Sequence, residues 1–325
     1  MTASLSAEQA RVLAQGPFPD YPFAPKAFVH PNGLTQSYLD EGAGAPVLML
    51  HGNPSWSFYW RHLVLGLRDR YRCIVPDHIG MGLSDKPDDA AHGRASVAGG
   101  RMPGATASYA YTLQSRIDDL ERLLDSLDLG DDLTLAVHDW GGMIGFGWAL
   151  KHAGRIKRLV ILNTAAFPLP AAKRFPRRLA MGRDSRVGGF LIRAFNLFAG
   201  GAAWMGTERR LSPAIRRAYT APYRGWHNAI STLRFMQDIP LSDRDAAWPL
   251  VAEAARRLPE FADRPAFLGW GLKDFVFDKH FLNGFTAALP NAEVHAFADA
   301  NHYVLEDKHE ILVPAIRAFL DQHPV

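Results

Sequence analysis

A carboxylate stands at a sharp strand-to-helix transition near the middle of the chain. Residues 133–143 read Leu-Thr-Leu-Ala-Val-His-Asp-Trp-Gly-Gly-Met, an apolar run that leads into Asp139 and then into Gly141 and Gly142. A nucleophile at such a turn needs small neighbours, because the backbone is strained there and the side chain must project outward. Val137 stands where a glycine usually precedes the nucleophile, so the pattern is incomplete on that side. The segment predicts Asp139 as a nucleophile, with a helix N-cap as the alternative.

An acid and a base follow in the chain order that such a site requires. Asp274 comes directly after one predicted strand and His302 directly after the next. Because the carboxyl ends of parallel strands meet at one edge of a sheet, both side chains are expected beside Asp139. Asp278 is the competing acid but lies further from the strand, and Asn163, after an earlier strand, cannot ionise. We therefore predict Asp139, Asp274 and His302 as nucleophile, acid and base.

Two side chains are candidates for stabilising negative charge in the same pocket. Residues 51–56 read His-Gly-Asn-Pro-Ser-Trp at the end of the first predicted strand of the parallel set, which places the Asn53 amide near the Trp140 indole. Donors that are preorganised where charge develops are the usual source of rate enhancement. Two neutral donors suit an anionic leaving group. The alternative is that Asn53 only closes the turn and Trp140 only fills the core.

The elements that must position these residues alternate along the chain. Short apolar runs are separated by amphipathic stretches, which is typical of βαβ units around a mostly parallel sheet. Strands are predicted at residues 47–51, 73–76, 133–138, 159–162, 266–270 and 294–297, with an antiparallel edge strand at 33–40. The predicted fold class is α/β, with helices on both faces of the sheet.

Two segments interrupt this alternation. Residues 90–108 are rich in Gly, Ala and Ser without periodicity, which predicts a long loop inserted without chemistry of its own. Residues 165–248 have helical patterning but no clear strand, which predicts an inserted helical cap. The expected main domain therefore consists of residues 1–164 and 249–325.

The composition excludes several classes of protein. With 325 residues, 48% of them hydrophobic, the chain is long enough for a large core and is not a disordered protein. Its single cysteine, Cys73, cannot form an intrachain disulfide or a thiolate metal site. No apolar region of signal-peptide type is present in residues 1–16. We expect a cytoplasmic protein that needs neither a metal nor an organic cofactor.

Positive charge is concentrated in one middle segment. The net charge is only +3, yet residues 165–264 carry 17 Lys and Arg against 8 Asp and Glu. No zinc-finger spacing or aromatic RNA-binding pattern accompanies this charge, so we expect no nucleic-acid partner. The arginines are instead a candidate surface for an acidic partner or a peripheral membrane contact with anionic lipid, with a solvated helical face as the alternative. They are Arg174, Arg177, Arg178, Arg209, Arg210, Arg216 and Arg217.

The same segment contains apolar side chains that suit a hydrophobic small-molecule substrate. Phe190, Phe195 and Phe198 are the candidate lining of an apolar substrate pocket. The alternative is burial of this helix against the main domain, since a helix that is apolar all round is usually buried.

With these residues in view, the chain resembles the α/β-hydrolases of the haloalkane dehalogenase type over nearly its whole length. In that family an aspartate nucleophile, a histidine base and an acid form the triad, while Asn and Trp side chains hold the departing halide. The resemblance implies the α/β-hydrolase fold and assigns these roles to Asp139, His302, Asp274, Asn53 and Trp140. An Asp acid after the later strand, combined with an Asn and Trp pair, resembles a subfamily that dehalogenates poorly.

The motifs resemble still more closely the β-lactone decarboxylases of bacterial long-chain olefin biosynthesis. The resemblance lies in His-Gly-Asn-Pro-Ser-Trp-Ser at 51–57, the segment 76–87, His-Asp-Trp-Gly-Gly-Met-Ile at 138–144 and Lys-Asp-Phe-Val-Phe-Asp at 273–278. Members of that group convert a cis-disubstituted β-lactone into an alkene and carbon dioxide. They act in an assembly with thiolase, synthetase and reductase partners, so the resemblance implies protein partners of that kind.

Several alternatives remain open at this stage. A haloalkane dehalogenase would use His302 to activate water against the covalent ester. An epoxide hydrolase would need cap tyrosines, for which Tyr219 and Tyr223 are candidates, and a non-catalytic scaffold would have kept only the fold. For a β-lactone, Asp139 has two possible targets, the ring carbon bonded to oxygen and the carbonyl carbon, and the sequence favours neither.

Overall fold

The computed structural model describes residues 5–89 and 108–325. The predicted insertion at 90–108 therefore lies outside the described residues except for its last position. Ser108 and Tyr109 form the short strand β6, which pairs in parallel with β5 (Asp88–Asp89).

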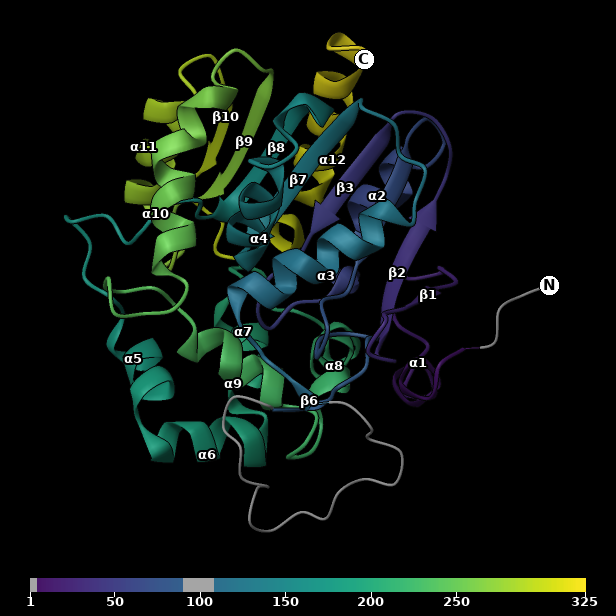
Figure 1. The fold of residues 1–325 in the computed structure, drawn as a ribbon, viewed down its shortest axis with the longest axis vertical. Helices are drawn as coiled ribbons and strands as arrows, with labels where there is room; N and C mark the ends of the chain where they lie inside the picture. The colour runs from purple at the N-terminus through teal and green to yellow at the C-terminus, as the bar shows by residue number, and fades with distance from the viewer. Residues whose placement is uncertain (1–4, 90–107) are drawn as a thin grey trace.

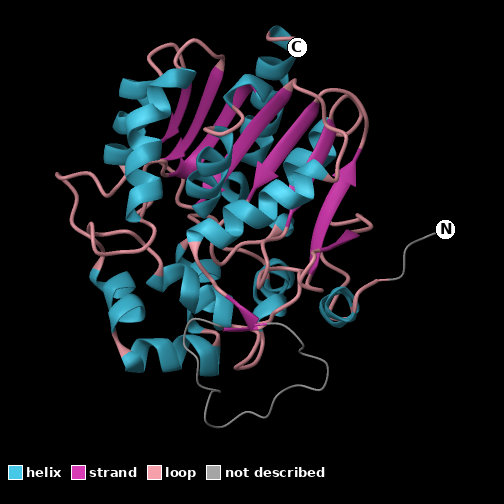
Figure 2. Cartoon of the chain, in the orientation of Figure 1, coloured by secondary structure: helices cyan, strands magenta, loops and turns pink. Residues whose placement is uncertain are grey.

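The described residues contain an eight-stranded sheet in the order β1-β2-β4-β3-β7-β8-β9-β10. The strands are β1 (Lys26–Val29), β2 (Thr35–Glu41), β3 (Pro46–Leu50), β4 (Arg72–Pro76), β7 (Leu133–Asp139), β8 (Ile156–Thr164), β9 (Ala266–Gly271) and β10 (Glu293–Phe297). The pairs β1–β2 and β2–β4 are antiparallel, and all other neighbours are parallel (Figure 2). The prediction of a mostly parallel sheet is confirmed.

One strand prediction needs a correction. Residues 33–40 were expected to form the edge strand, but β2 is an inner strand because β1 pairs on its outer side. Most side chains of β1 are exposed, so its sequence has no apolar alternation that could reveal it.

Helices cover both faces of the sheet because its strands are apolar on both sides. In β3, Leu48 and Leu50 face one hydrophobic core, whereas Val47 and Met49 face the other. The first core contains side chains from α3 (Leu113–Asp125), α4 (Trp140–Ala149), α10 (Trp248–Arg257) and α11 (Lys279–Ala288). The second contains side chains from α2 (Arg61–Leu67) and α12 (Val304–Gln322), and α1 (Ala7–Leu13) lies near the N-terminus (Figure 1).

A group of helices follows β8 and lies beyond the carboxyl ends of the parallel strands (Figure 1). They are α5 (Arg177–Asp184), α6 (Arg186–Phe195), α7 (Leu197–Met205), α8 (Pro213–Thr220) and α9 (Ile230–Gln237). Ser185 and Ser212 cap α6 and α8 by accepting backbone N–H groups. We call these five helices the cap. Among the described residues, no helix is long and apolar enough to cross a membrane.

Candidate active site

The backbone at the end of β7 forces the Asp139 side chain out of the sheet. Asp139 has φ 51° and ψ −129°, a strained conformation for a residue with a side chain. Its neighbours must be small. A Cβ atom on Gly52 would lie 1.9 Å from Asp139 Oδ1, and one on Gly141 would lie 2.0 Å from the Leu50 carbonyl oxygen. Both glycines are therefore needed for this close approach.

The Asp139 carboxyl is buried and held by backbone donors. Its Oδ1 accepts a 2.6 Å hydrogen bond from the backbone N–H of Asn53. Burial raises the pKa of Asp139 above its ordinary value, although His302 and the backbone N–H groups of Asn53 and Trp140 act in the opposite direction. The carboxylate thus lies against the two backbone N–H groups that, in α/β enzymes with this turn, stabilise a developing anion.

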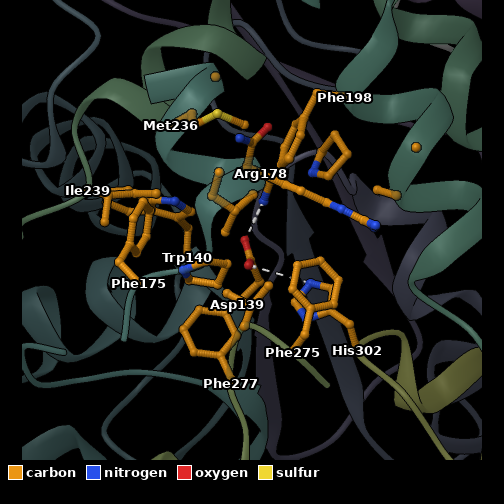
Figure 3. A pocket seen from close by; sticks show the side chains of 18 of the residues that line it. Asp139, Trp140, Phe175, Arg178, Phe198, Met236, Ile239, Phe275, Phe277 and His302 are labelled. Carbon is orange, nitrogen blue, oxygen red and sulfur yellow. Dashed lines mark hydrogen bonds and ion pairs between the residues drawn. The ribbon is translucent and has the colours of Figure 1, made fainter. Parts of the chain in front are cut away.

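His302 connects this carboxyl to the predicted acid. Its Nδ1 lies 2.9 Å from Asp274 Oδ2. Its Nε2 lies 3.5 Å from Asp139 Oδ2, the pair that can be followed in Figure 3. Burial opposes the imidazolium form, but the carboxylates of Asp274 and Asp139 outweigh it and raise the pKa of His302. The structure therefore brings the three predicted triad residues together in the predicted order of contacts.

Asp274 is oriented by Asn163, a residue that the sequence excludes as the acid only because its amide cannot ionise. Asn163 Nδ2 donates to Asp274 Oδ2 at 3.0 Å, while its Oδ1 accepts the Gly271 backbone N–H at 2.8 Å. The competing carboxylate, Asp278, is occupied elsewhere, since it caps α11 and forms an ion pair with Lys173 at 2.6 Å. A neutral amide at the end of β8 thus fixes the acid that follows β9.

His138, which precedes the nucleophile, has a structural role in the site. Its ring faces away from Asp139, stacks on Tyr59 with a centroid distance of 4.1 Å, and its Nε2 lies 2.9 Å from the His302 carbonyl oxygen. Burial lowers the pKa of His138 well below its ordinary value, so the ring is neutral. It supports the loop that carries His302. Side chains alternate along β7, and this alternation indicates that the His138 ring points away from Asp139.

Both predicted leaving-group donors line the same cavity as Asp139. The Asn53 side chain comes from the turn after β3, and its Nδ2 donates to the Thr232 carbonyl oxygen in α9 at 2.9 Å. Trp140 packs edge-on against Phe235, and within the described residues its indole N–H has no hydrogen-bond partner. One N–H of Asn53 and the indole N–H of Trp140 are therefore left for a ligand.

The cavity has a volume of about 490 Å³ and is mainly apolar. Its lining includes Phe175, Phe198, Met236, Ile239 and Phe277, which are labelled in Figure 3. It also includes Phe167, Leu169, Leu179, Leu191 and Ile192. Besides Asp139 and His302, the charged side chain in the lining is Arg178. A long hydrocarbon chain fits this chemistry better than a polar metabolite.

Phe198 is the one predicted pocket phenylalanine that lines the cavity. Phe190 and Phe195 do not line it, and they are 53% and 68% exposed. The prediction was wrong for these two because α6 turns Leu191 and Ile192 toward the cavity, and their neighbours on the other face point outward.

The two cap tyrosines also lie outside the cavity. Tyr219 donates to Glu306, and Tyr223 donates to the Ser55 carbonyl oxygen at 3.0 Å. Both hydroxyls are therefore committed to structural hydrogen bonds and neither residue is placed to polarise an epoxide oxygen. In the described part of the chain, no group of three His, Cys, Asp or Glu side chains is arranged to hold a metal ion.

The fold and the chain's relatives place it in one family. Residues 45–309 match the family model described as the alpha/beta hydrolase fold, so the chain belongs to the α/β-hydrolase family. A cis-3-alkyl-4-alkyloxetan-2-one decarboxylase of Xanthomonas campestris is 63% identical over 95% of this chain and 99% of its own length. Haloalkane dehalogenase 2 of Mycobacterium tuberculosis is 31% identical over 91% of this chain and 94% of its own.

A solved structure supports the same fold. The crystal structure of a haloalkane dehalogenase from Agrobacterium tumefaciens matches with a TM-score of 0.79 at 24% identity, covering 95% of this chain and all of the other. The resemblance inferred from the sequence motifs is confirmed, and the chain is an enzyme of the haloalkane dehalogenase-like group.

Proposed function

We propose that this enzyme converts cis-3,4-dialkyl β-lactones into an alkene and carbon dioxide, with Asp139 as nucleophile. The observation that carries the proposal is a carboxylate fixed beside an imidazole at the base of an apolar cavity. The 63% identical relative that is named as an oxetanone decarboxylase supports this substrate class. A β-lactone is an oxetan-2-one, and its two alkyl chains suit the apolar lining.

The contacts of Asp139 favour attack on the saturated ring carbon rather than on the carbonyl carbon. Attack on the carbonyl would need backbone N–H donors for the developing oxyanion. The Asn53 N–H already binds Asp139 Oδ1, so it serves the nucleophile itself. Displacement at the ring carbon instead releases a carboxylate, which the free donors of Asn53 and Trp140 suit.

The proposed reaction balances without water, oxidant or cofactor. Asp139 forms a C–O bond to the ring carbon that carries the ring oxygen, and that carbon–oxygen bond breaks to free the substrate carboxylate. The bond between this carboxylate and the neighbouring ring carbon then breaks, and its electron pair forms the alkene. The Asp139 oxygen leaves with its own bonding pair, which regenerates the free carboxylate and releases carbon dioxide.

In this scheme His302 and Asp274 hold Asp139 as a charged nucleophile. The raised pKa of His302 favours an imidazolium facing Asp139 Oδ2, which stabilises the carboxylate before attack. Once Asp139 is esterified, its charge no longer favours the imidazolium, so His302 can lose its proton and then activate water against an ester that cannot lose carbon dioxide. Haloalkane hydrolysis is therefore the second candidate function, favoured by the Asn53 and Trp140 pair and by the 31% identical dehalogenase.

The test compares wild type, Asp139→Asn and His302→Gln on a dialkyl β-lactone and on a long 1-haloalkane. We expect alkene from wild type and none from Asp139→Asn. His302→Gln should accumulate an alkyl ester with the haloalkane, visible by intact-protein mass, yet still release alkene from the lactone, because that step needs no water. Alkene from Asp139→Asn, or a 3-hydroxy acid as the main wild-type product, would contradict the proposal.

The enzyme is also proposed to be cytoplasmic and to work beside the enzymes that make its substrate. The buried, unpaired thiol of Cys73 suits a reducing compartment. A strained β-lactone must be supplied by a ring-closing reaction on a 3-hydroxy acid, so thiolase, synthetase and reductase partners of an olefin-synthesis assembly fit this chemistry. Co-purification of the native protein with such activities tests this association.

A further inference from the structure

The cavity opens to solvent through the cap. Met181 in α5 and Leu197 and Met205 in α7 line the cavity, and each is also about half exposed. Leu197 and Met205 stand at the two ends of α7, and both contribute to the cavity lining. Arg178 spans the gap, with its Nη1 3.3 Å from Met205 Sδ. We call these four side chains the mouth.

The helix beside the mouth is apolar on its outer side as well as its inner side. Val187, Phe190 and Ala194 follow one another at spacings of three and four residues on α6, and all are exposed. Phe190 packs against Phe195 and Trp226 at centroid distances of 6.3 and 5.7 Å. A helix with apolar residues on both sides is normally buried on both sides. The outer face of α6 is therefore expected to contact a second apolar surface.

The charge around this face has one sign. Residues 173–224 contain 12 Lys and Arg but only two acidic residues. Those two, Asp184 and Glu208, are paired with Arg183 and Lys273, each at 2.6 Å. Within residues 5–89 and 108–325, the exposed arginines that form no ion pair include Arg174, Arg177, Arg186 and Arg217. The face therefore presents a surplus of positive charge.

Tryptophan and arginine occur together at a further exposed position. The guanidinium groups of Arg210 and Arg216 lie 5.4 and 4.7 Å from the ring centroid of Trp204, which is exposed in α7. Tryptophan is enriched at the boundary between water and lipid, and arginine is attracted to anionic headgroups. Amphipathic helices with aromatic and aliphatic residues among basic ones are typical of proteins that lie on bilayers.

We propose that the mouth and the outer faces of α6 and α7 form a docking surface for an anionic lipid bilayer. Exposed apolar side chains would enter the headgroup region while the arginines contact lipid phosphates. Docked in this way, the mouth faces the lipid phase, so a lipophilic substrate enters and a hydrocarbon product leaves without crossing water. This last consequence rests on the proposed function, whereas binding to lipid does not.

The test is co-sedimentation of the whole protein with vesicles, with no substrate present. One set contains phosphatidylcholine alone, and the other contains phosphatidylcholine and phosphatidylglycerol in equal parts. We expect binding to the anionic set, weakened by high salt. The variant Arg177→Glu/Arg178→Glu/Arg186→Glu should bind at least roughly tenfold more weakly, because three attractive charges near the lipid phosphates become repulsive. Val187→Ser/Phe190→Ser should also lose affinity.

A matched control reverses three exposed arginines of the main domain, Arg70, Arg122 and Arg256, and changes the net charge equally. This control should keep its binding. The cap variants should keep the wild-type thermal midpoint, and every variant should keep the wild-type circular dichroism spectrum, although the control loses three surface ion pairs. Equal losses in the two triple variants, equal binding to both vesicle sets, or no binding would each overturn the proposal.

Two further outcomes distinguish bilayer docking from dimerisation and from the proposed reaction. If size-exclusion chromatography finds a dimer that Val187→Ser/Phe190→Ser dissociates, the face is an interface between copies and the bilayer proposal is wrong. Asp139→Asn should bind vesicles as wild type does. Vesicle binding without alkene formation in the wild type would therefore contradict the proposed reaction while leaving the docking surface intact.

Discussion

Asp139 must satisfy two opposing demands. A dry pocket makes a carboxylate a stronger nucleophile, but it also favours the protonated form that cannot attack. The site resolves the conflict with the Asn53 N–H on one carboxyl oxygen and His302 near the other. Even so, burial dominates and raises the pKa of Asp139. The ionised form that is needed for activity is therefore expected to lower the stability of the folded state.

This charge predicts a stability change in Asp139→Asn. Because the folded-state pKa of Asp139 is raised, its contribution stabilises the fold at low pH and is lost as the pH rises through that pKa. At pH 7 the ionised side chain is a net cost, which an amide of the same size removes. The inactive variant should have a higher thermal midpoint than wild type at pH 7, with a smaller difference near pH 4.

Asp278→Asn provides the control of opposite sign. Burial acts against the charged form of Asp278, but its hydrogen bonds to Lys173 and His280 outweigh it and lower the pKa of this carboxyl. Removing its charge should lower the thermal midpoint at pH 7 and have less effect near pH 3. Calorimetric scans across this pH range measure both variants. A lower midpoint for Asp139→Asn at pH 7 would show that its ion pair with His302 outweighs burial.

At the scale of elements, the turn after β3 and the turn after β7 interlock around the nucleophile. Gly52 leaves room for the Asp139 carboxyl, and Gly141 leaves room for the backbone at the end of β3, since added Cβ atoms would lie 1.9 Å from Asp139 Oδ1 and 2.0 Å from the Leu50 carbonyl oxygen. Gly52→Ala should displace the Asp139 carboxyl and reduce kcat/KM by about a hundredfold or more, equivalent to ~2.7 kcal/mol. Alkene or halide release measures this loss.

The control for this change is Gly154→Ala. An added Cβ at Gly154 meets no atom within 4 Å, so this variant should keep both activity and stability. Gly141→Ala, which places its Cβ against a backbone carbonyl, should also destabilise the fold, by about 2 to 4 kcal/mol. Wild-type activity in Gly52→Ala would mean that the two turns move apart easily.

The sequence predicted elements well where one physical signal determined them. Contiguous apolar runs located the parallel strands because both faces of the sheet are covered, and the chain order located Asp139, Asp274 and His302. It could not reveal Asn163, because an amide at a strand end is compatible with many turns. It also misassigned Phe190 and Phe195, since α6 has apolar residues on its outer side as well as its inner side, and its sequence does not show which side faces a cavity.

At the scale of the whole molecule, a buried ion pair of the main domain is joined to the cap by the Tyr219 hydroxyl. Glu306 in α12 accepts two hydrogen bonds from Arg61 in α2, at 2.5 and 2.9 Å, and a third from the Tyr219 hydroxyl in α8. All three residues are almost completely buried. Because they come from three helices, the network sets how the cap lies over the strand ends that carry His302.

Removing Glu306 should therefore destabilise the entire fold. Glu306→Ala leaves the Arg61 charge buried without a partner, and we expect a loss of about 3 to 5 kcal/mol in the free energy of unfolding. Tyr219→Phe should cost less, about 1.5 to 3 kcal/mol, because the lost hydrogen bond is to a charged group. Denaturant titrations measure both. Although burial acts against the charge of Glu306, Arg61 outweighs it and keeps its pKa lowered, so the wild-type contribution should fade as the pH falls through that pKa.

A double variant separates the lost interaction from the stranded charge. Arg61→Met/Glu306→Leu removes both ionised groups and should recover much of the stability that Glu306→Ala loses, because the two desolvation costs disappear together. If the double variant is as unstable as Glu306→Ala, the geometry of this network, rather than charge balance, holds the cap in place.

The route through the cap leads to a prediction about chain length. Leu197 lines the cavity and is half exposed at its mouth, so a larger side chain there narrows the passage. Leu197→Trp should lower kcat/KM roughly tenfold for a β-lactone with long alkyl chains and leave a short-chain lactone nearly unaffected. Ala194→Trp, on an exposed position of α6 outside the lining, is the matched control and should change neither.

A comparison of kcat with kcat/KM then shows whether Leu197→Trp affects substrate entry or the active site. A passage that only restricts entry lowers kcat/KM while kcat at saturating substrate stays unchanged, unless product release through the same mouth limits turnover. A short-chain substrate that is slowed as much as a long one would mean that position 197 disturbs the site rather than the route. Because Asp139 is buried beneath the cap, the length-dependent loss is the result expected if substrates reach it between α5 and α7.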